Sequence, residues 1–155
     1  MMRPVMAIAL GAVAGALSRY YVGLTLTPMT TTSIPYGTLL ANVTGCLLMG
    51  FLVTLSLGKM VNLHPDLRLL LLTGFLGSYT TFSSYELELA KLLIKRQITA
   101  DLLYWGGSTF FGFLSLQMGS QLAERLLSHW EASLEPDPPS LSSETSPQPI
   151  NTRDR

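Results

Sequence analysis

The chain has 155 residues, of which 48% are hydrophobic and 13% are charged, with a formal net charge of zero. Soluble domains carry about 25% charged residues, so this composition is typical of a membrane protein, and the zero net charge argues against a nucleic-acid partner. A single cysteine, Cys46, excludes a disulfide within the chain. The sequence has no spacing of nucleophiles, bases or metal ligands typical of an enzyme, so we expect no enzymatic activity.

Four segments are long and apolar enough to cross the ~30 Å hydrocarbon core of a bilayer as helices. They cover residues 4–26, 37–57, 67–94 and 100–122. The first also fits a cleaved signal peptide loosely, because Arg3 precedes an apolar run, but the three later segments favour a membrane-spanning helix. The sequence therefore predicts an all-α, multi-pass protein with four transmembrane helices, located in the inner (plasma) membrane of the cell.

Small residues recur on one face of the first and the fourth segment. They are Ala7, Gly11 and Gly15 in the first segment and Ser108, Gly112, Ser115 and Gly119 in the fourth. Small residues at this spacing let helix backbones approach closely in lipid. We therefore expect a tight helical bundle or an oligomer.

The composition changes near residue 130. Residues 1–130 hold the four predicted helices, joined by loops too short to contain a soluble domain. Residues 131–155 are rich in proline, serine and acidic residues and poor in apolar ones, so they cannot bury enough apolar surface to fold. The sequence predicts a transmembrane domain followed by a disordered tail.

Basic residues are balanced between the two ends of the predicted bundle. Four passes place both termini on one side, with Arg3, Lys59, Arg68 and Arg125 there and Arg19, Lys91, Lys95 and Arg96 on the other side. The positive-inside rule therefore gives almost no preferred orientation. Either the protein inserts both ways and pairs with an inverted copy of itself, or residues outside this count fix its orientation.

The third segment is interrupted by the stretch GFLGSYTTFSS, residues 74–84. The run from Gly77 to Thr81 is poor in helix formers, and irregular backbone is tolerated at membrane depth only where protein or water covers it. A break near the midplane would present carbonyls to a small cation and amides to an anion. The alternative is a continuous helix whose Ser and Thr hydroxyls bond back to their own turn.

Several polar and aromatic groups within the segments are suited to an anion. They are the amide of Asn42, the hydroxyls of Thr80, Thr81, Tyr104 and Ser108, and the rings of Phe82 and Tyr85. Amides and hydroxyls replace the water that a small anion sheds, and an aromatic ring has a positive edge. A full positive charge would hold the anion too tightly to let it leave. For Asn42 alone, a hydrogen bond between helices is the stronger alternative.

These features resemble the fluoride channel family, the small bacterial exporters called Fluc or CrcB, over about residues 7–125. The resemblance rests on GAVAGALSRY in the first segment, GTLLANVTGCLLMG in the second and GFLGSYTTFSSYELE in the third. It implies an antiparallel homodimer of two inverted copies with two fluoride paths. Fluoride would leave the cell passively down its electrochemical gradient, which reduces fluoride toxicity.

The resemblance also implies roles for individual residues. The implied fluoride path consists of Asn42, Phe82, Tyr85, Ser108, Tyr104 and Thr81. A structural sodium ion at the dimer axis would be held by the backbone carbonyls of Gly77 and Thr80, and charged vestibule positions would be Arg19 and Glu88. This chain departs from the family pattern at three positions, with Tyr85 for a second phenylalanine, Gly112 for a hydroxyl residue and Ser78 for a glycine.

Two other functions fit parts of the sequence. A small multidrug-type transporter of dual topology would need a membrane-embedded carboxylate for proton exchange. The first segment has none, and Glu86 and Glu88 lie late in the third segment. A non-transporting scaffold protein would suit the small-residue faces and the tail, but it gives no reason for the donors in the third segment.

Overall fold

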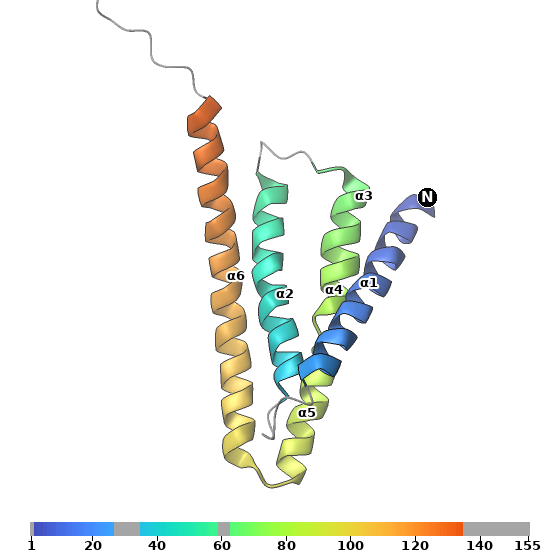
Figure 1. Cartoon of the computed structure of the whole chain (residues 1–155), viewed down its shortest axis with the longest axis vertical. Helices are drawn as coiled ribbons and strands as arrows, with labels where there is room; N and C mark the ends of the chain where they lie inside the picture. The colour runs from blue at the N-terminus through green and yellow to red at the C-terminus, as the bar shows by residue number, and fades with distance from the viewer. Residues whose placement is uncertain (1, 27–34, 59–62, 135–155) are drawn as a thin grey trace, which may run out of the picture.

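The computed structural model describes residues 2–26, 35–58 and 63–134, and the regular structure within these ranges is helical. The helical passes run side by side along the bundle (Figure 1). They are α1 (Met2–Leu26), α2 (Tyr36–Leu57), an interrupted third pass, and α6 (Ile98–Leu134). The beginning of α1 and the end of α6 lie at the same end of the bundle, as expected for an even number of passes.

The third pass is interrupted where the sequence predicts a break. It consists of α3 (Pro65–Arg68), the π-helical segment η2 (Leu69–Leu76), α4 (Gly77–Tyr79) and, after a gap, α5 (Ser83–Ile94). Thr80 ends α4 with φ −81° and ψ 155°, which is extended backbone. The predicted break is thus confirmed, and the alternative of a continuous helix is wrong; the depth of the break in the bilayer stays a prediction. The π-helical segment was not predicted.

The last helix is longer than the sequence suggested. α6 has 37 residues and continues to Leu134, whereas we expected a helix over residues 100–122. The expected domain boundary at residue 130 therefore falls inside this helix. Residues 135–155 lie outside the described residues, so the disorder of the tail stays a prediction; Lys59 also lies outside them.

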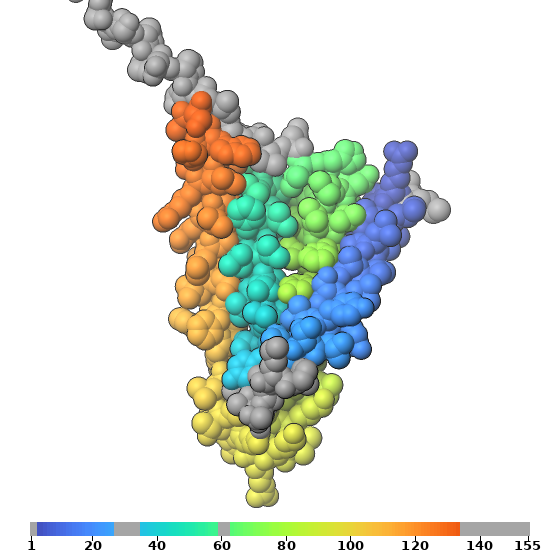
Figure 2. All heavy atoms as spheres, viewed as in Figure 1, coloured from blue at the N-terminus to red at the C-terminus, as the bar shows by residue number. Residues whose placement is uncertain are grey.

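Close backbone contacts join the helices in two pairs, α1 with η2 and α2 with α6. A Cβ atom at Gly11 would collide with the carbonyl oxygen of Leu70, and one at Gly119 would collide with the carbonyl oxygen of Leu47. The predicted role in helix packing is therefore confirmed for Gly11 and Gly119, whereas a Cβ at Gly112 would meet only the Cys46 sulfur at 3.6 Å. Figure 2 shows the resulting order across the bundle, with α6 beside α2 on one side and α1 against the third pass on the other.

The Gly119 contact leads to a prediction about stability. We expect Gly119→Ala to lower the free energy of unfolding by about 1–3 kcal/mol, because the new methyl group must push the α2 backbone away. Thermal unfolding of the purified protein in detergent measures the change. Gly106→Ala is the matched control on the same helix, since a Cβ there meets no atom within 4 Å. Equal melting temperatures for the two variants would contradict the packing argument.

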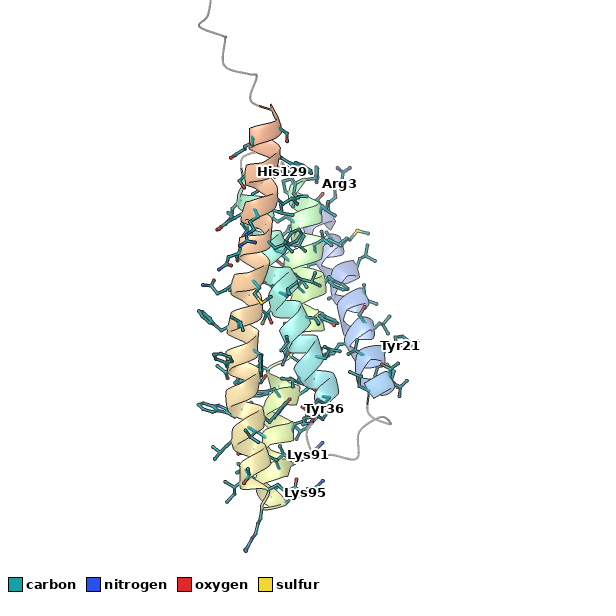
Figure 3. The ribbon with its side chains drawn as sticks, turned by 60° about the vertical axis from the view of Figure 1, so that its left-hand side comes forward. Arg3, Tyr21, Tyr36, Lys91, Lys95 and His129 are labelled. Carbon is teal, nitrogen blue, oxygen red and sulfur yellow. The ribbon has the colours of Figure 1, made fainter. Side chains whose placement is uncertain are left out.

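Two described helices, Arg3–Leu26 and Tyr36–Leu57, are long and apolar enough to cross a membrane by length and composition. The apolar side chains of Val5, Leu10 and Val13 on α1 are exposed, as they would be against lipid or a second copy. Figure 3 places Arg3 and His129 near one end of the bundle and Lys91 and Lys95 at the opposite end. Both ends of the bundle thus carry basic side chains.

Candidate functional site

A cavity of about 400 Å³ lies beside the break, between α2, the junction of α4 with α5, and α6. Its walls are formed by Asn42, Gly45, Cys46, Met49, Thr80, Thr81, Phe82, Tyr85, Ser108, Thr109, Gly112, Phe113 and Leu116. No Lys, Arg, Asp or Glu is among these described wall residues. An anion in the cavity would therefore meet dipoles and ring edges instead of a full charge.

Asn42 on α2 holds the break in place. Its Oδ1 accepts a hydrogen bond from the Thr81 N–H at 2.8 Å, and its Nδ2 donates to the Thr81 carbonyl oxygen at 3.1 Å. The Asn42 amide thus pairs with both the N–H and the carbonyl of Thr81, which lies outside the helix. Left unpaired, these two backbone groups would be costly to bury. The hydrogen bond between helices, which the sequence favoured for Asn42 alone, is therefore present, and Nδ2 keeps a second N–H on a residue of the cavity wall.

The break leaves the carbonyls of Gly77 and Thr80, among others, without their helical donors. In a continuous helix the Thr81 N–H would donate to the Gly77 carbonyl and the Ser84 N–H to the Thr80 carbonyl. Here the Thr81 N–H donates to Asn42, and the Ser84 N–H donates to the Thr81 hydroxyl at 3.2 Å. Gly77 and Thr80 are the residues predicted to hold a sodium ion, and their carbonyl oxygens are the hard ligands that such an ion accepts.

Arg19 on α1 reaches this break instead of standing apart near the end of its helix. Its Nη1 donates to the Thr80 carbonyl oxygen at 3.5 Å, and the contact is partly buried. The guanidinium therefore satisfies one lone pair of that carbonyl. The carbonyl has two lone pairs, so the bond with Arg19 leaves one of them for another ligand.

Most hydroxyls in the cavity wall are engaged by the protein itself. The Thr80 hydroxyl donates to the Leu76 carbonyl at 3.0 Å, and the Thr109 hydroxyl donates to the Trp105 carbonyl at 3.0 Å. The Thr81 hydroxyl interacts with the hydroxyls of Ser83 and Ser84. Of these, the Thr80 and Thr81 hydroxyls are ones that the sequence suggested as donors to an anion, and both are already engaged within the protein.

Ser108 on α6 differs from the other hydroxyl residues of the wall. Within the described part of the chain its hydroxyl has no hydrogen-bond partner, although the residue lines the cavity. A hydroxyl can rotate its hydrogen toward an acceptor that enters. Ser108 is therefore the hydroxyl donor best placed to serve an anion, together with the remaining N–H of Asn42.

Phe82 and Tyr85 present aromatic rings at the cavity. Phe82 directly precedes α5 and is 73% exposed, whereas Tyr85 on α5 is buried, and their ring centroids lie 6.1 Å apart at an angle of 40°. The Tyr85 hydroxyl donates to the Trp105 carbonyl at 3.3 Å. The hydroxyl that distinguishes Tyr85 from a phenylalanine thus does not serve as a donor to the cavity, and the ring is what it contributes.

Tyr104 lies behind the cavity and is not part of its wall. Its side chain is 2% exposed, its ring contacts Tyr85 at 5.2 Å, and its hydroxyl donates to Glu88 Oε2 at 2.7 Å. The Thr38 hydroxyl on α2 donates to the other oxygen, Glu88 Oε1, at 2.8 Å. The carboxylate therefore joins α2, α5 and α6, and it occupies the donor that we expected Tyr104 to offer to fluoride.

The structure thus brings together Asn42, Thr81, Phe82, Tyr85 and Ser108 from the predicted path. From the sequence alone, no role in the path was assigned to Cys46. Cys46 lies on α2, and its sulfur is at the cavity wall, facing Gly112 on α6. Thr38, the partner of Glu88, was also missed. Both residues are four positions from Asn42 and share its helix face, so spacing would have found them. Among the described residues, no group of three or more His, Cys, Asp or Glu side chains is placed to hold a metal.

Comparison with known proteins identifies relatives over most of the chain. Residues 6–120 match the protein family described as CrcB-like protein, Camphor Resistance (CrcB). The chain is 50% identical over 113 residues to a protein of Trichormus variabilis named fluoride-specific ion channel FluC, covering 73% of this chain and 82% of that protein. Proteins with the same name from Synechococcus sp. and Synechocystis sp. are 45% and 46% identical, over 76% and 81% of this chain and 89% and 95% of theirs.

Proposed function

Since the chain belongs to the CrcB-like family, we propose that it is a channel that lets fluoride leave the cell and so reduces fluoride toxicity. The family membership agrees with an all-α membrane protein, so the predicted fold class is confirmed. It leaves the small multidrug transporter and the scaffold protein without support. Relatives that carry the name of a fluoride-specific channel support the choice of ion.

The observation that carries the proposal is the uncharged, donor-bearing cavity at the break. Fluoride is small and strongly hydrated, so it needs hydrogen-bond donors when it loses water. Ser108 and Asn42 supply an O–H and an N–H, and the rings of Phe82 and Tyr85 supply positive edges. None of these groups binds the ion covalently or carries a full charge, so passage needs no chemical step and release is not opposed.

We extend the proposal to a homodimer of inverted copies in the inner membrane. The Phe82 ring is 73% exposed and Gly77 is exposed, so this side of the cavity and of the break lacks a covering element in one chain. A second copy would supply that cover. Basic side chains at both ends of the bundle support insertion in either orientation, because neither end is favoured by the positive-inside rule (Figure 3).

The same proposal includes a structural sodium ion between the two copies. The carbonyls of Gly77 and Thr80 have lost their helical donors, and two copies would offer twice this number of oxygens around one axis. The ion would offset the negative ends of the interrupted helices. Exchange of sodium for N-methylglucamine should dissociate the dimer, as measured by size-exclusion chromatography with light scattering. An unchanged molar mass after exhaustive exchange argues against the ion.

Fluoride efflux tests the function itself. Liposomes with the purified full-length protein and loaded with potassium fluoride in sodium buffer are expected to release fluoride, recorded with a fluoride electrode, as soon as valinomycin relieves the membrane potential. Chloride-loaded liposomes are the control for selectivity and should retain their anion. Efflux no faster than from protein-free liposomes contradicts the proposal.

A further inference from the structure

The hydrogen-bond donors of the cavity beside the break are unevenly distributed along α6. At Ser108 the cavity offers a hydroxyl that has no hydrogen-bond partner among the described residues, but one turn further the wall residue is Gly112, and beyond it is Leu116. Across from Gly112 lies Cys46 on α2, and Met49 on the same helix is also a wall residue. Beyond Ser108, the Thr109 hydroxyl already donates to the Trp105 carbonyl, and the later wall residues of α6, Gly112, Phe113 and Leu116, have no polar side chain.

The contact between Gly112 and Cys46 is loose enough to accept a small side chain. A Cβ atom at Gly112 would have one neighbour within 4 Å, the Cys46 sulfur at 3.6 Å, which is ordinary van der Waals contact. Gly119, two turns further along the same helix, is different, because its Cβ would collide with the Leu47 backbone. Gly112 is thus not required for helix packing, and its lack of a side chain affects the cavity instead.

We propose that Cys46 and Gly112 form the donor-poor step of the anion path and thereby set its throughput. The inference rests on the proposed fluoride function. A thiol is a weak hydrogen-bond donor and glycine has no side-chain donor at all. An ion that moves past Ser108 therefore loses a hydroxyl contact and gains little in exchange, so the free energy of the ion rises at this point.

Serine and alanine at these two positions separate the hydroxyl from the change in shape. We expect Gly112→Ser to conduct about fivefold faster than Gly112→Ala, since one neutral hydrogen bond of about 1 kcal/mol corresponds to that ratio. Cys46→Ser should likewise conduct faster than Cys46→Ala. Single-channel currents of the full-length protein in planar lipid bilayers with fluoride as the permeant anion measure each ratio directly.

Gly106 provides the matched control, because a Cβ there meets no atom within 4 Å and Gly106 is not a wall residue. Gly106→Ser and Gly106→Ala should carry equal currents. Equal currents for Gly112→Ser and Gly112→Ala, in variants that retain the melting temperature of the wild type, overturn the donor-poor step. A wild-type protein without any fluoride current overturns the proposed function instead, so the two failures are distinguishable.

Discussion

Replacing Asn42 with alanine is expected to stop fluoride conduction and to destabilise the protein. The substitution removes both partners of Thr81, the acceptor of its N–H and the donor to its carbonyl oxygen. Each buried polar group left unpaired costs about 1–3 kcal/mol, so the free energy of unfolding should fall by about 2 kcal/mol or more. Fluoride efflux from liposomes should fall at least about 100-fold, which corresponds to about 2.7 kcal/mol in the barrier.

Two variants show whether the loss of conduction and of stability in Asn42→Ala comes from the lost hydrogen bonds at the break. Asn42→Asp keeps an oxygen for the Thr81 N–H but turns a carboxylate oxygen toward the Thr81 carbonyl in place of the N–H, so it should also be less stable than the wild type. Thr44→Val, on the same helix as Asn42, removes a 2.9 Å hydrogen bond to the Tyr79 hydroxyl of α4 but no bond to Thr80 or Thr81, and it should still conduct. Normal efflux from Asn42→Ala contradicts the assigned role of this amide.

Phe82→Ile is expected to abolish fluoride efflux while leaving the fold and the oligomeric state unchanged. The ring is 73% exposed at the cavity, so isoleucine there creates no packing defect within the chain. It removes the aromatic ring, whose positive edge attracts an anion, and replaces it with an aliphatic group that has no such edge. Liposome efflux, read together with light scattering of the purified variant, measures both expectations.

Phe110→Ile is the matched control for the loss of a ring. Phe110 on α6 is 62% exposed and is not among the wall residues, so its variant should conduct like the wild type. If Phe82→Ile retains wild-type efflux, the Phe82 ring is not part of the path. If both variants lose conduction, the loss follows from removing any exposed ring of the bundle and does not depend on the cavity.

The break could be predicted because its signal is local. Glycine and hydroxyl residues in an otherwise apolar segment disfavour a helix without any knowledge of the neighbours. The π-helical segment η2 has no such signal, because LLLLTGFL is apolar apart from Thr73 and has no polar side to mark its helical period. The end of α6 was placed too early, because polar residues after residue 122 suggested a boundary although alanine, leucine and glutamate among them favour a helix.

The members of the site could be predicted more readily than their partners. Asn42 and Ser108 are conspicuous as polar side chains in apolar segments, and the structure places both at the cavity. Which donors stay available depends on contacts between distant segments. Tyr104 donates to Glu88 and Tyr85 donates to the Trp105 carbonyl, and neither bond follows from spacing along one helix.

The length of α6 has a practical consequence for determining orientation. At about 1.5 Å per residue, its 37 residues extend about 55 Å, while the hydrocarbon core of a bilayer is only about 30 Å thick. If α6 crosses the bilayer along its normal, several of its turns lie in the headgroup layer or in water. A protease site inserted after Trp130 would be cut only by protease on the side where α6 emerges, so the cut fraction in sealed vesicles would report how many molecules face each way.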